Sequence, residues 1–66
     1  MEDGHDERLI SLVHDLRTPL AIVAGFAELL ERRADSLSEA DRADYVARIR
    51  EGADRMNELL DEALGL

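Results

Sequence analysis

Residues 9–30 read LISLVHDLRTPLAIVAGFAELL, and this stretch decides the fold. Its apolar residues recur at alternating spacings of four and three, which is the heptad pattern of helices that pack at a shallow left-handed angle. The members of this first row are Leu9, Val13, Leu16, Leu20, Val23, Ala27 and Leu30. The pattern therefore predicts a helix from about residue 7 to about residue 33.

A second apolar row runs beside the first and widens the surface that this helix has to bury. It consists of Leu12, Pro19, Ile22, Phe26 and Leu29. A helix that is apolar over so wide an arc needs at least two neighbouring helices to cover it.

A second helix is predicted from about residue 39 to about residue 64. Its apolar row is Val46, Ile49, Ala53, Met56, Leu60 and Ala63, with Tyr45, Leu59 and Leu64 beside it. The loop between the helices covers about residues 34–38, where either Ser36 with Glu39 or Ser38 with Asp41 could cap the second helix. We therefore expect an all-α fold, an antiparallel helical hairpin that homodimerises into a four-helix bundle.

Composition limits the classes of partner. A chain of 66 residues forms one small domain, and the absence of cysteine excludes disulfides, so self-association is the expected source of stability. The net charge of −8 disfavours binding to nucleic acids and to anionic membrane surfaces. The longest run without a charged residue, 18–27, has about half the length of a membrane-spanning helix, so we expect a cytoplasmic domain without direct membrane contact. The parent protein could still be an inner-membrane sensor.

The first six residues are interpreted as a linker or chain terminus, followed by the domain at 7–66. His5 with Asp3 and Asp6 is the nearest approach to a metal-binding group, and we interpret these three residues as part of a disordered acidic terminus. No metal ion and no cofactor is therefore expected to be bound by this chain.

His14 is the candidate for chemistry. At about 100° per residue it lies about 140° around the helix from the first row, so it should be exposed. Arg17 and Thr18 follow at the two spacings that bring side chains together on a helix. Asp15 could fix one ring nitrogen of His14, although adjacent residues diverge by about 100° in a regular helix.

Pro19 and Gly25 are both unfavourable inside a helix. Proline removes a backbone hydrogen bond and costs about 3 kcal/mol, so a kink is expected just below His14. The alternative is a separate helix that starts near Thr18 with Pro19 in its first turn. Gly25 lies on the His14 face, where it either leaves room for a docking protein or is simply tolerated.

The run His14-Asp15-Leu16-Arg17-Thr18-Pro19-Leu20 resembles the H-box of bacterial sensor histidine kinases, within their dimerisation and histidine-phosphotransfer domain. The resemblance covers about residues 7–64. It implies that His14 is the phosphoacceptor, that Asp15 orients or deprotonates it, and that Thr18 positions a water molecule for phosphatase activity. It also implies that Pro19 bends the helix between signalling states, while Arg17 near His14 could offset phosphate charge.

The resemblance implies three partners: a second copy of the chain, an ATP-binding catalytic domain of the same protein, and the receiver domain of a response regulator. The chain itself has no glycine-rich nucleotide-binding run, so it should not autophosphorylate alone, and ATP and magnesium belong to the full-length kinase. One rival hypothesis is a purely structural dimerisation module in which His14 is inert. A monomeric phosphotransfer relay would need four helices in one chain, whereas two are predicted.

Overall fold

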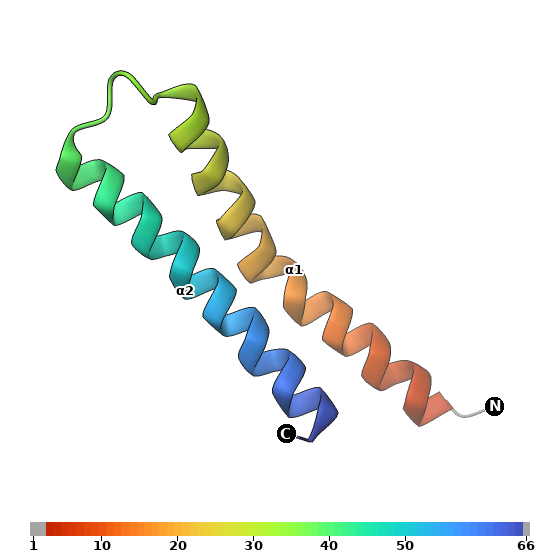
Figure 1. Cartoon of the computed structure of the whole chain (residues 1–66). Helices are drawn as coiled ribbons and strands as arrows, with labels where there is room; N and C mark the ends of the chain where they lie inside the picture. The colour runs from red at the N-terminus through yellow and green to blue at the C-terminus, as the bar shows by residue number, and fades with distance from the viewer. Residues whose placement is uncertain (1–2, 66) are drawn as a thin grey trace.

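The computed structural model describes residues 3–65, with side-chain surroundings from residue 7 onward. Two helices, α1 (Asp3–Arg32) and α2 (Glu39–Leu64), run antiparallel and side by side. The connecting loop lies at one end of the hairpin and both ends of the chain lie at the other (Figure 1). The prediction of an all-α helical hairpin is confirmed.

The helix boundaries differ from the predicted ones mainly at the start of α1. This helix begins at Asp3, so residues 3–6, which were interpreted as a linker and a disordered acidic terminus, belong to it. The side chains of Asp3, His5 and Asp6 lie outside the described residues. The structure therefore does not test whether these residues bind a metal ion.

The proline does not divide α1. The helix continues through Pro19, so the alternative of a separate helix starting near Thr18 is wrong. Pro19 is buried between the two helices, where its ring adds apolar surface to the contact. Favourable packing of this kind offsets part of the cost of the missing backbone hydrogen bond.

Side-chain and backbone caps fix the ends of α2. Ser38 accepts a hydrogen bond from the backbone N–H of Asp41 at 3.0 Å, so the second of the two predicted caps is the one used. The Arg42 guanidinium donates to the carbonyl of Ala34 at 2.9 Å and ties the loop to the first turn of α2. At the other end, Gly65 has φ of 74°, and its N–H reaches the carbonyls of Asp61 and Glu62.

The two apolar rows of α1 have different roles. Most of the second row faces α2, and Leu12, Pro19, Phe26 and Leu29 are buried or half-buried there. Much of the first row is uncovered. Together with apolar residues of α2 it forms a surface that we call the exposed row, defined as Leu9, Val13, Leu20, Val46 and Leu60.

The hairpin is too thin to enclose a core of its own. The Cα atoms span 53 × 21 × 10 Å, so the molecule is a single layer of two helices. Among the residues that the structure describes, Pro19, Gly52 and Leu59 are the buried ones, and Leu59, with 7% of its surface exposed, is the one with a long aliphatic side chain. A stable fold therefore requires that the exposed row be covered.

One segment of the described chain, Glu7–Arg32, is long and apolar enough to cross a membrane by length and composition alone. The charge-free run at 18–27 covers only part of this segment. The longer segment also contains Asp15 and Arg17, and its two apolar rows give it the composition of a helix that packs against other helices on two sides.

Candidate functional site

A groove of about 650 Å³ runs between the two helices and contains His14. We call it the His14 groove. Its lining comes from α1 through His14, Asp15, Thr18, Pro19, Ile22 and Phe26, and from α2 through Arg48, Glu51, Gly52 and Arg55. His14 lies about 140° around α1 from Leu9, so the groove opens away from the exposed row.

His14 lies at the edge of this groove and is accessible. Its side chain is 84% exposed, in agreement with the angular prediction. The Nδ1 atom of His14 lies 3.6 Å from Oδ1 of Asp15, whose side chain is 55% exposed. The two side chains therefore turn toward each other despite the divergence of adjacent helix positions, and Asp15 is placed beside Nδ1 rather than Nε2.

Thr18 joins His14 and Asp15 because it follows His14 by one helical turn on the same face. The structure brings these three residues together along one wall of the groove, with Pro19 next to them. Arg17 is exposed and does not line the groove. It lies about 60° around the helix from His14, on the side toward the exposed row.

The far end of the groove from His14 has an apolar wall. Ile22 and Phe26 line it, and the ring of Phe26 lies against that of Tyr45 with the centroids 5.2 Å apart and the planes tilted by 55°. This arrangement is within the range of favourable aromatic contacts and holds the two helices together at this level.

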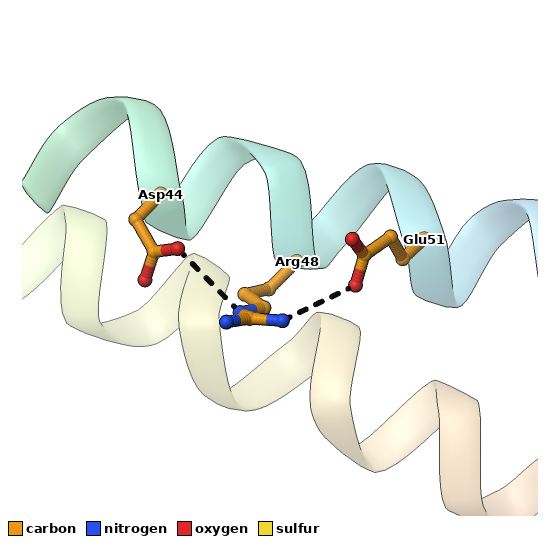
Figure 2. A network of polar contacts seen from close by, with 3 residues as sticks. All are labelled: Asp44, Arg48 and Glu51. Atoms are coloured by element: carbon orange, nitrogen blue, oxygen red, sulfur yellow. Dashed lines mark hydrogen bonds and ion pairs between the residues drawn. The ribbon is translucent and has the colours of Figure 1, made fainter. Parts of the chain in front are cut away.

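The charged wall contributed by α2 was missed by the sequence analysis. Arg48 lines the groove and lies between Asp44 and Glu51 on its own helix, at 3.6 Å and 3.5 Å (Figure 2). Arg55 pairs with Glu58 at 3.1 Å. A signal was present, since Arg48, Gly52 and Arg55 follow one another at spacings of four and three and so share one face of α2.

Gly52 lets the two helices approach closely under the groove. A Cβ atom at this position would lie 2.6 Å from Cγ2 of Val23 and 3.0 Å from the carbonyl oxygen of Pro19. Contacts this short are not tolerated, so a larger residue would push α2 away from α1. Gly52 therefore sets both the spacing and the register of the two helices beside His14.

Gly25, also on the His14 face, is different. A Cβ atom there would meet nothing within 4 Å, so packing inside the hairpin does not require glycine. Both alternatives for Gly25, room for a docking protein and a tolerated glycine, are compatible with this open space.

The acidic and basic side chains that line the groove are equal in number, whereas the chain as a whole is acidic. Asp15 and Glu51 face Arg48 and Arg55 in the lining, whereas the whole chain has a net charge of −8. An anionic group is therefore less disfavoured here than over most of the surface. Within the part of the chain that the structure describes, no three His, Cys, Asp or Glu side chains form a metal-binding cluster.

Comparison with known proteins adds independent information. The profile described as "His Kinase A (phospho-acceptor) domain" matches residues 7–66. The chain is similar to Sensor protein DivL of Caulobacter vibrioides, with 42% identity over 53 residues, which covers 80% of this chain and 7% of that protein. It is also similar to Drug sensory protein A of Synechocystis sp., with 27% identity over 66 residues, which covers 100% of this chain and 10% of that protein.

The chain thus spans a tenth or less of the length of these relatives. No solved structure gave a significant match.

Proposed function

The chain belongs to the His Kinase A (phospho-acceptor) domain family, and from this premise we propose that His14 accepts a phosphoryl group from ATP and passes it to an aspartate of a response regulator. The observation that carries the proposal is the grouping of an exposed His14 with Asp15 and Thr18 along one groove. Helix packing requires none of these three residue types at these positions.

In the proposed reaction Nε2 of His14 is the nucleophile. Asp15 is placed beside Nδ1, so it favours the tautomer with the proton on Nδ1 and leaves the lone pair on Nε2. The P–N bond forms as the bond from the γ-phosphorus to the bridging oxygen of ATP breaks, and ADP leaves with that electron pair. The Nδ1 proton then moves to Asp15 or to water, giving a neutral phosphoimidazole ring.

Transfer onward reverses the roles of donor and acceptor. A carboxylate oxygen of the receiver aspartate attacks the phosphorus, the P–N bond breaks, and the electron pair returns to Nε2. Because His14 is 84% exposed, an in-line approach is open to either partner. In the phosphatase direction the Thr18 hydroxyl, one turn from His14, would orient a water molecule toward the aspartyl phosphate of the regulator.

The other substrates are supplied by partners. ATP and magnesium would come with a separate catalytic domain of the same protein, and the receiver domain would bring its own aspartate. We expect the domain to act in the cytoplasm as a homodimer, the second copy covering the exposed row. The groove opens on a different side, so such a dimer would leave His14 accessible.

The second candidate function is an inert dimerisation module. The observation that favours it is the exposed row, which supports association whether or not His14 reacts. It does not account for Pro19 inside α1, because alanine would be more favourable there for a helix that serves only packing.

The deciding experiment measures label at His14. The chain, joined to the ATP-binding domain of its own kinase, is incubated with radiolabelled ATP and magnesium and compared with the His14→Gln variant. We expect an acid-labile, base-stable label that the variant lacks. Label that persists in the variant, or no label although the catalytic domain binds ATP, would favour the inert module.

A further inference from the structure

Arg55 lines the His14 groove from the opposite helix. The contacts at Gly52 show which residues of α1 lie opposite Arg55. The Gly52 contacts place that residue beside the segment between Pro19 and Val23. Because α2 runs antiparallel to α1 and both advance 1.5 Å per residue, Arg55 lies near the level of Thr18. That is about one helical turn, or about 6 Å along the axis, from His14.

Arg48 lines the same groove at a different level. By the same counting it lies near the level of Gly25, about 16 Å along the axis from His14 and beyond the reach of an arginine side chain. The two arginines are similarly exposed, 50% for Arg48 and 53% for Arg55, and each pairs with the glutamate three residues later. Arg48 also pairs with Asp44.

We propose that the guanidinium of Arg55 binds the phosphoryl oxygens carried on Nε2 of His14. This inference rests on the proposed function and names a further residue of the same site. It moves the phosphate-charge role, which the sequence analysis gave to Arg17, to a residue of α2. Arg17 lies outside the groove, whereas Arg55 lines it together with His14.

The present partner of Arg55 does not prevent this role. The ion pair with Glu58, at 3.1 Å, joins two exposed side chains, and exposed pairs of this kind contribute little. A phosphoryl group offers more charge and several oxygens, which a guanidinium can bind through two parallel hydrogen bonds. The phosphoryl oxygens would therefore replace the Glu58 carboxylate. Arg55 keeps all its protons, and bonds form and break only at phosphorus.

The experiment uses the full chain and a small phosphoryl donor, so that no catalytic domain is needed. The wild type is treated with potassium phosphoramidate, and the phosphohistidine at position 14 is followed by ³¹P NMR as a function of pH. A nearby guanidinium favours the dianion and lowers the second pKa of the phosphoryl group. We expect Arg55→Ala to raise this pKa by about half a unit relative to the wild type.

Arg48→Ala is the matched control and should leave the phosphoryl pKa unchanged. Arg17→Ala removes a charge close to His14 but outside the groove, so it should raise this pKa less than Arg55→Ala does. Arg55→Lys keeps the charge but not the two-pronged geometry, so its value should lie between those of wild type and Arg55→Ala. Circular dichroism verifies that each variant keeps its helices. An unchanged pKa in Arg55→Ala, or an equal rise in Arg17→Ala, would overturn the inference and leave the proposed function intact.

A different result would overturn both proposals. If no phosphohistidine forms, or if it forms equally in His14→Gln, then His14 is not the acceptor and Arg55 has no phosphoryl group to bind. The two failures are thus distinguishable from one set of spectra.

Discussion

The imidazole of His14 is exposed and has one carboxylate, that of Asp15, beside it. Its side chain is 84% exposed, and Oδ1 of Asp15 lies 3.6 Å from its Nδ1 atom. In the proposed mechanism, the reaction of this exposed histidine depends on the tautomer that the Asp15 carboxylate favours.

Replacing Asp15 tests that dependence. Asp15→Asn keeps the size of the side chain but removes the negative charge that attracts the Nδ1 proton. We expect phosphorylation of His14 by the ATP-loaded catalytic domain to slow by about 100-fold, the lower end of what a positioned base contributes. The initial rate of label incorporation measures this.

Asp54→Asn is the control, because Asp54 is similarly exposed but pairs with Arg50 outside the groove. Its rate should equal that of the wild type. If Asp15→Asn behaves in the same way, the carboxylate has no part in the reaction.

At the residue scale the sequence predicts what is local. His14, Asp15 and Thr18 meet because they lie within five residues on one helix, so their spacing alone brings them together. Arg55 could not be assigned to the site in this way. Its level beside Thr18 depends on the register between two helices, and heptad patterns allow several registers.

At the scale of the elements, Gly52 and Gly25 form a natural pair for comparison. Both are helical glycines, but a Cβ atom would meet Val23 and Pro19 at Gly52 and nothing at Gly25. Helix propensity favours alanine over glycine by about 1 kcal/mol at either position, so the two sites differ only in the space available.

Gly52→Ala should therefore destabilise the hairpin by about 1 kcal/mol, since the clash outweighs the gain in propensity. Gly25→Ala should stabilise it by a similar amount. Thermal unfolding followed by circular dichroism measures both changes. A stabilising Gly52→Ala would show that the two helices adjust without cost.

Val23→Ala removes the methyl group nearest the new Cβ atom, at 2.6 Å, and provides the test of mechanism. In the double variant the loss caused by Gly52→Ala should become smaller than in the wild-type background. Additive effects would mean that the destabilisation comes from elsewhere.

The two helices and the loop were largely predictable from the sequence, but which apolar row of α1 packs against α2 was not. Periodicity predicted two helices and a short loop, and the structure begins α2 at Glu39 and ends it at Leu64, as expected. Both rows of α1 are apolar, so the pattern could not tell which one meets α2. The answer depends on Pro19, which is buried between the helices, and on Gly52, whose lack of a side chain leaves room for Pro19 and for Val23 of the first row.

At the scale of the whole molecule, a layer 10 Å thick with an uncovered apolar side should not be stable alone. Covering the exposed row with a second copy would give a four-helix bundle, in which hydrophobic burial is shared between the two hairpins. Stability should then depend on protein concentration.

Leu20→Glu places a charge in the middle of the exposed row, where Leu20 is 52% exposed. We expect the wild type to have twice the chain mass in sedimentation equilibrium and the variant to shift to the monomer mass with loss of helix content. Ile22→Glu, in the groove, is the control and should keep the dimer mass. A Leu20→Glu variant that stays dimeric would place the interface elsewhere.

The close approach of the two helices at Gly52 also fixes their relative position along the helix axis. If α2 slid along α1 by one turn, about 5.4 Å, a bulkier residue would meet Pro19 and Val23, and a different α2 side chain would face His14. The close contact at Gly52 therefore resists sliding of α2 along α1. Which α2 side chains line the groove with His14 thus depends on the one glycine inside α2, where no side chain separates the two helices.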